Sequence, residues 1–192
     1  MGPCPITIWR RAAEVTEALL AAPSPRFDDD WSARNHVPLP CVLSPEPVIE
    51  YPDPCALPAD CAHPCPWPAE LAERIQGWDA QHDGLYWREL SAAPGTKVGG
   101  YPRWIQAPEW PVCACGRRMD HLLTVASDEF GTQGRWLPWE DREDPKITSE
   151  RSIGDRDAWA PHGLMLGDVG SLYLFTCPVC AERPLAGTMQ CS

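Results

Sequence analysis

The clearest helical pattern lies near the N-terminus. Between residues 7 and 22, apolar residues recur at helical spacing with arginine and glutamate between them: Ile8, Ala12, Val15, Leu19 and Leu20. Steps of three and four residues place side chains on one face of a helix, so this spacing predicts an amphipathic helix. Pro23 and Pro25 follow and end it, because proline cannot continue a helix.

Five further segments have patterns that predict local structure. The spacing predicts a short helix over residues 68–77, where Pro68 suits the first turn and Leu71 and Ile75 share a face. Residues 121–126 and 170–176 are short apolar runs bounded by turn residues, which predicts two strands. Residues 36–68 contain ten prolines among apolar residues. This composition favours extended chain and edge strands, since proline cannot donate a hydrogen bond within a central strand. The charged residues 138–157 are expected to form an exposed loop.

Composition narrows the class of protein. The chain has 192 residues, of which 44% are hydrophobic, 10 are tryptophan and 23 are proline. This predicts a chain with many loops and turns and little long helix, in which large aromatic rings anchor the core. The formal net charge of −11 argues against a nucleic-acid partner, because phosphates require a basic face. No apolar run approaches the ~20 residues that span a membrane.

The N-terminal residues also indicate the cellular compartment of the protein. Arg10, Arg11, Glu14 and Glu17 interrupt what would be the apolar region of a signal peptide. We therefore expect a cytoplasmic protein with reduced thiols, in which the 10 cysteines are metal ligands or buried apolar residues before they are disulfides.

Two pairs of cysteines have the spacing of metal ligands. The first knuckle, residues 111–116, contains Cys113 and Cys115, and the second knuckle, residues 177–180, contains Cys177 and Cys180. One precedes the first predicted strand and the other follows the second. Tetrahedral Zn²⁺ takes four such thiolates, which predicts a structural zinc that joins the two strands. The alternative is four buried thiols without a metal. The single residue between Cys113 and Cys115 is shorter than the usual gap of two to four.

Other polar clusters carry weaker signals. Cys55, Cys61, His63 and Cys65 have a spacing that allows a second metal site, but the prolines among them stiffen the backbone, and incidental or buried thiols are the competing interpretation. We interpret the acidic run 28–30 as a solvated connecting loop.

Several strings resemble the YwqG-like family (DUF1963). They are Lys97-Val98-Gly99-Gly100-Tyr101-Pro102-Arg103-Trp104, His121 to Ser127, Gly167-Asp168-Val169-Gly170 and the closing Gln190-Cys191-Ser192. The resemblance covers residues 36–192 and leaves residues 1–35 as an N-terminal helix with an acidic linker. The Gly-Gly-x-Pro-x-Trp string beside a cysteine knuckle is also similar to the programmed cell death protein 2 group. The resemblance implies a strand-rich α+β fold and no settled activity.

The same strings suggest a binding surface. Trp104 and Gln106 alternate with Ile105, so on a strand they would share one face. With Lys97 and Asp168 they would border a cleft for a protein or a small polar ligand. The competing interpretation places Trp104 in the core and makes Asp168 a turn residue.

Three classes of function follow from these observations. The first is a zinc-stabilised protein-interaction module, by analogy an immunity or assembly-type protein. The second is a cysteine- or metal-dependent hydrolase, for which the candidate groups are His121, Asp155, His162 and Asp168, although no Gly-x-Ser-x-Gly, His-Glu-x-x-His or P-loop string occurs. The third is a zinc-ribbon nucleic-acid binder using Arg103, Arg117 and Arg118, against which the net charge argues. The first class is favoured, with no catalytic residue assigned.

Overall fold

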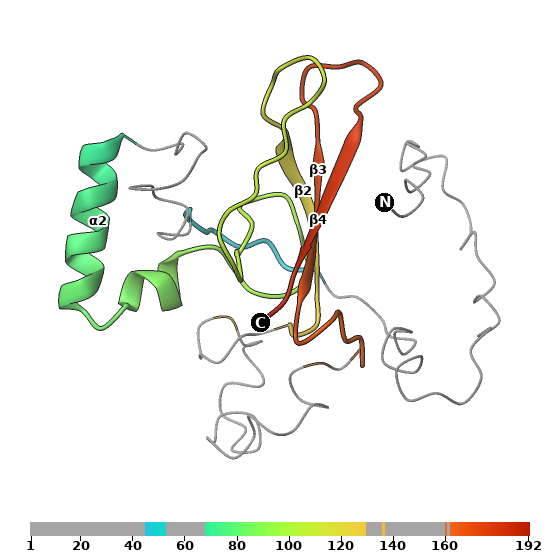
Figure 1. The fold of residues 1–192 in the computed structure, drawn as a ribbon. Helices are drawn as coiled ribbons and strands as arrows, with labels where there is room; N and C mark the ends of the chain where they lie inside the picture. Colours follow the sequence, from blue (N-terminus) through green and yellow to red (C-terminus); the bar gives the residue numbers. More distant parts are fainter. Residues whose placement is uncertain (1–44, 53–67, 130–135, 137–159, 161) are drawn as a thin grey trace.

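The computed structural model describes residues 45–52, 68–129, 136, 160 and 162–192. The helix predicted over 7–22, the acidic run 28–30, the group around Cys55 and the loop predicted over 138–157 lie outside these residues. The described part is a mixed α+β structure dominated by an antiparallel sheet (Figure 1).

In the part of the chain that the structure describes, the sheet has four strands in the order β1-β2-β3-β4. They are β1 (Lys97–Val98), β2 (Asp120–Ala126), β3 (Ser171–Thr176) and β4 (Leu185–Gln190). β2 and β3 confirm the two strands predicted from the apolar runs. Asp120 pairs with Thr176, so the start of β2 lies opposite the end of β3. The two knuckles, one before β2 and one after β3, therefore emerge from the same end of the sheet, and Figure 1 shows their loops side by side there.

Within the described residues, two helical segments lie beside the sheet. The helix predicted over 68–77 is confirmed as α2 (Ala69–Gln81), which extends beyond the predicted end. A short π-helical segment, η3 (Tyr86–Leu90), follows it. Ala72 is the one buried residue of α2. Among the described residues, no helix is both long enough and apolar enough to cross a membrane.

Aromatic rings form the core on one face of β3. Tyr173 and Phe175 are completely buried, and the Trp104 ring packs against both, with centroid separations of 4.9 and 5.9 Å. Trp110 closes the cluster edge-on to Trp104 at 5.7 Å. This core continues directly into the cysteines, since Cys113 and Cys177 belong to the same buried cluster.

The expectation that Trp104 and Gln106 share a strand face is wrong. Residues 101–107 form no strand; Trp104 is buried and Gln106 is exposed. The backbone N–H groups of Ile105 and Gln106 donate to the side-chain oxygen of Gln190 instead of to a neighbouring strand. A side-chain acceptor thus replaces the β ladder at this position, and the alternation of a strand does not apply.

Candidate metal centre

The four cysteines of the two knuckles come together at one point. The Sγ atoms of Cys113, Cys115, Cys177 and Cys180 all lie within 4.8 Å of one another. The Sγ atoms of Cys113 and Cys180 are 3.8 Å apart, and those of Cys115 and Cys177 are 3.7 Å apart. Four sulfurs at about 2.3 Å from a central tetrahedral ion would be separated by about 3.8 Å. The cluster therefore has the dimensions to hold a single metal ion.

The first knuckle is a tight loop closed by backbone hydrogen bonds. The N–H of Cys113 donates to the carbonyl of Arg117, and the N–H of Gly116 donates to the carbonyl of Cys113, both at 2.8 Å. Gly116 has a φ of 82°, which a residue with a side chain rarely adopts. This turn brings both cysteine sulfurs into the cluster although only Ala114 separates them.

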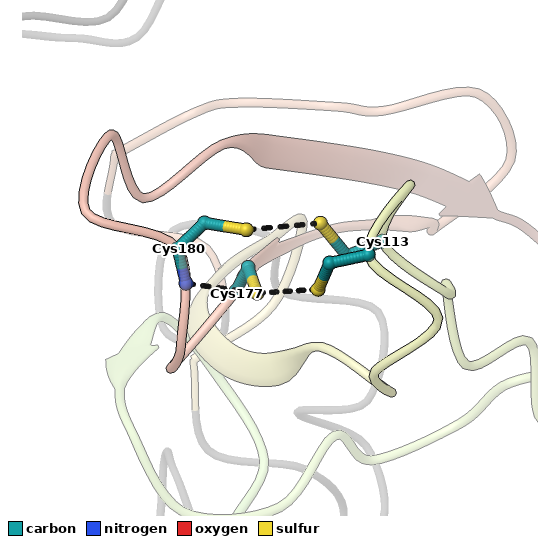
Figure 2. Close-up of side chains that lie close together, drawn as sticks. Cys113, Cys177 and Cys180 are labelled. Atoms are coloured by element: carbon teal, nitrogen blue, oxygen red, sulfur yellow. Dashed lines mark hydrogen bonds between the residues drawn. The ribbon is translucent and has the colours of Figure 1, made fainter.

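The second knuckle follows the end of β3, and the chain then turns back into β4. The N–H of Cys177 donates to the carbonyl of Pro184 at 3.1 Å, and the N–H of Arg183 donates to that of Cys180 at 3.0 Å. Within the loop, the N–H of Cys180 points at the sulfur of Cys177, 3.5 Å away (Figure 2). Such N–H donors stabilise a negatively charged sulfur. Figure 2 also shows Cys113 facing Cys177 and Cys180 from the opposite loop.

The four sulfurs of the cluster influence one another's protonation. The backbone N–H groups of Cys180 and Val179 lower the pKa of Cys177 to about 6. The neighbouring sulfurs of Cys115, Cys177 and Cys113 raise the pKa of Cys180 to about 12. One thiolate therefore forms readily, and further thiolates are opposed by the charge already present. A dication at the centre removes that opposition, since a coordinating thiol is deprotonated outright.

Exposure differs among the four cysteines. Cys113 and Cys177 are buried, Cys180 is partly buried and Cys115 is exposed. The site thus lies at the surface end of the aromatic core, with two of its sulfurs facing the interior.

The residues of the predicted binding cleft have separate surroundings. The Nζ of Lys97 forms an ion pair with Glu50 at 2.7 Å. The ring of Trp104 is in the core. The Nε2 of Gln106 donates to the carbonyl of Cys191 at 2.7 Å. Asp168 is exposed, and its backbone carbonyl accepts hydrogen bonds from Ser192. A buried Trp104 ring cannot line an open cleft with the exposed residues.

The two described histidines that were candidates for catalysis have ring nitrogens close to other polar groups, although Nε2 of His162 makes no hydrogen bond. Nδ1 of His121 lies 2.9 Å from the carbonyl of Gly99 and Nε2 lies 2.8 Å from Oγ1 of Thr124. Nδ1 of His162 accepts from the N–H of Leu164, and Nε2 lies 3.0 Å from Oε1 of Glu129. Asp155 lies outside the described residues.

Two buried polar side chains, Glu50 and Gln190, form hydrogen bonds with the backbone between residues 93 and 107. Their roles were not predicted from the sequence. Oε2 of Glu50 accepts from the N–H of Ala93 at 2.6 Å and from Lys97, and Oε1 accepts from the N–H of Tyr101 at 2.6 Å. Gln190, which is 2% exposed, holds the backbone of residues 105–107 through three hydrogen bonds. Gln190 belongs to the closing string of the chain, which was a usable signal. Glu50 sits in the proline-rich segment, where nothing singled it out.

Comparisons of the chain with protein-family models, with curated proteins and with solved structures give no match. The resemblance to the YwqG-like family therefore stays a prediction.

Proposed function

We propose that this chain is a zinc-stabilised binding module, in which Cys113, Cys115, Cys177 and Cys180 hold one structural zinc ion. The observation that carries the proposal is the convergence of four sulfurs, within 4.8 Å, from two knuckles at one end of the sheet. Four thiolates in a tetrahedral set select zinc or iron–sulfur chemistry. The separations of 3.7 and 3.8 Å suit a single central ion, because the inorganic core of a cluster would hold the thiolates further apart.

The zinc would be structural because the protein supplies all four ligands. A catalytic zinc keeps one coordination position for water or substrate. Here the ion would join the segment before β2 to the segment after β3 and fix the end of the central strand pair. It would also secure the aromatic core, since Cys113 and Cys177 pack in the same buried cluster as Trp104 and Phe175.

We assign the binding role to the surface formed by α2 and η3. These two elements line an apolar groove of about 630 Å³, bounded by Leu71, Arg74, Ile75, Gly77, Trp78, Gln81, Tyr86 and Leu90. Trp78 is 39% exposed at this groove. An aromatic side chain that is half open to solvent is a frequent anchor for a protein partner. An immunity or assembly-type role fits this arrangement, with the partner a protein.

Cobalt substitution tests the metal assignment. Chain refolded with Co²⁺ should show strong thiolate-to-cobalt charge-transfer absorption and the visible bands of a tetrahedral ion. Cys115→Ser should lower the charge-transfer intensity by about a quarter, because three of the four thiolates remain. Cys191→Ser, the matched control outside the cluster, should leave the spectrum unchanged. The weak spectrum of six-coordinate cobalt, or no uptake, would contradict the proposal.

The binding role needs its own test. The tagged chain, purified from its own cells, should retain a stoichiometric protein, and Trp78→Ala should abolish that retention. Val98→Ala is the control, because Val98 is 82% exposed but lies on β1, away from the groove. Equal retention by both variants would remove the groove from the proposal and leave the zinc assignment standing.

A further inference from the structure

Oxidation chemistry of the four-cysteine centre follows from the way its sulfurs are paired. We propose that the centre is a thiol-oxidation site, at which a hydroperoxide converts the zinc-bound thiolates into two disulfides, Cys115–Cys177 and Cys113–Cys180, and releases the metal. This inference rests on the proposed zinc site and adds a modification to it.

Two sulfur–sulfur contacts between the knuckles give the pairing. Cys115 and Cys177 are 3.7 Å apart, and Cys113 and Cys180 are 3.8 Å apart. A disulfide has a sulfur–sulfur distance of about 2.05 Å, so each pair has to close by roughly 1.7 Å. Both contacts run between the knuckles, because each takes one cysteine from the first and one from the second. No cysteine is left over when the two bonds form.

Exposure gives the order of events. Each pair joins a more exposed sulfur to a buried one: exposed Cys115 to buried Cys177, and partly buried Cys180 to buried Cys113. A small peroxide in solution reaches the exposed member first. The buried member is then in place to attack the oxidised sulfur, which is the arrangement of a reactive cysteine next to a resolving cysteine.

The reaction balances for each pair. The Cys115 thiolate attacks hydrogen peroxide; an S–O bond forms, the O–O bond breaks, and the departing hydroxide takes up a proton to become water. The Cys177 thiolate then attacks the sulfenic sulfur of Cys115; the S–S bond forms, the S–O bond breaks, and the second hydroxide is protonated. The two sulfurs lose two electrons and one peroxide is reduced to two waters. Repeated at Cys113 and Cys180, the sequence consumes two peroxides and four protons and frees one Zn²⁺ ion.

The oxidised form should keep the fold. The two disulfides would connect the same knuckles that the metal connects, so the start of β2 and the end of β3 stay joined. Removing the metal from the reduced protein leaves no such link. Oxidation therefore exchanges a metal link for a covalent link, whereas chelation removes the link altogether.

The experiment uses the full zinc-loaded chain, hydrogen peroxide and a chromogenic zinc indicator. Metal content is measured first, so a chain without zinc refutes the proposed function before oxidation begins. We expect loss of all bound zinc, with one ion released for every two peroxides consumed. Peptide mapping without reduction should link the peptide ending at Arg117 to the peptide that contains the second knuckle. Retained zinc under excess peroxide, a Cys177–Cys180 bond, bonds to cysteines outside the centre, or sulfinic acids without disulfides would overturn the inference.

Two double variants resolve the pairing. Cys113→Ser with Cys180→Ser leaves the predicted pair Cys115 and Cys177, and Cys113→Ser with Cys177→Ser leaves the unpaired combination Cys115 and Cys180. The first should form its disulfide faster. Since both variants lose the metal, fragmentation of the cross-linked peptide from the wild-type chain provides the second measurement. A wild-type Cys115–Cys180 bond would refute the pairing, and Cys191→Ser should release zinc as the wild type does.

Discussion

The cysteine centre and the polar network formed by Glu50, Gln190 and the backbone of residues 93–107 do the same structural task by different means. Each joins segments far apart in the chain: 67 residues separate Cys113 from Cys180, and 84 separate Gln106 from Gln190. In the polar network every bond is made between groups of the chain itself. In the cysteine centre four sulfurs face one another at separations that could hold an ion between them. The polar network should therefore hold without any ligand, while the cysteine centre should depend on metal and on redox state.

Loss of a metal ligand should have the largest effect. Cys177→Ser removes a buried ligand, and structural zinc sites contribute about 10–16 kcal/mol of binding energy that is also folding energy. We expect a loss of several kcal/mol in the free energy of unfolding, measured by denaturant titration with zinc present. Cys191→Ser is the matched control and should have little effect. Equal free energies of unfolding for the two variants would show that Cys177 contributes no more to stability than a cysteine outside the centre.

The polar network is tested by two adjacent glycines. Gly99 and Gly100 both have positive φ, 72° and 68°, so an alanine at either costs about 1–2 kcal/mol. A Cβ at Gly100 would also collide with Oε1 of Glu50, whereas nothing lies within 4 Å of a Cβ at Gly99. We expect Gly100→Ala to lose about 2–5 kcal/mol of stability, more than Gly99→Ala. Thermal unfolding of both variants checks this. Equal losses of stability in the two variants would mean that the collision with Glu50 adds nothing to the cost of the Gly100 substitution.

Gln190→Glu should have a smaller but clear effect. The amide nitrogen of Gln190 donates to the carbonyl of Ala107 at 2.8 Å, and a carboxylate oxygen there can only repel that carbonyl. The two N–H bonds to the other oxygen can persist. An unsatisfied buried polar group costs about 1–3 kcal/mol. Gln81→Glu, on the exposed end of α2, is the control for the change in charge. A loss no greater than that of the control would remove Gln190 from the polar network.

The pH dependence of His121 should be the smallest effect. Burial, followed by the charge of Lys97, holds the pKa of His121 below its usual value of 6.5. The unfolded chain therefore takes up this proton at a higher pH than the folded chain. The resulting stability is present above pH ~6.5 and is lost as the pH falls toward the lower folded value.

His121→Asn isolates that contribution, because the asparagine amide can still donate to the carbonyl of Gly99. Denaturant titrations between pH 8 and pH 5 should show a steeper loss for the wild type than for the variant. Acid release of the metal affects both chains alike, so it cancels in the difference. Parallel curves would contradict a neutral buried His121.

The sequence predicted well wherever a local pattern determines structure. The apolar runs at 121–126 and 170–176 became β2 and β3, and Pro68, Leu71 and Ile75 marked α2. The four cysteines were found from spacing alone, because metal ligands come in close pairs on turns. The single residue between Cys113 and Cys115 is shorter than the usual spacing of zinc ligands. The turn at Gly116, with its positive φ, allows both sulfurs to reach the cluster despite this short spacing.

The failures come from contacts between distant residues. Alternation predicted a strand through Trp104 and Gln106, but the acceptor for that backbone is a side chain some 84 positions away. The proline-rich segment gave no hint that Glu50 would be buried, because its partners are the N–H groups of Ala93 and Tyr101 and the Lys97 ammonium. β1, with only two residues, is too short to produce a pattern.

The most direct test of the account is the metal content of the purified chain. Protein made in zinc-replete medium and dialysed exhaustively should carry one zinc per chain in native mass spectrometry. The same ion should be absent from the variant in which Cys113, Cys115, Cys177 and Cys180 are all serine. Cys191→Ser should retain it. A wild-type chain that is well folded, fully reduced and free of metal would contradict the account.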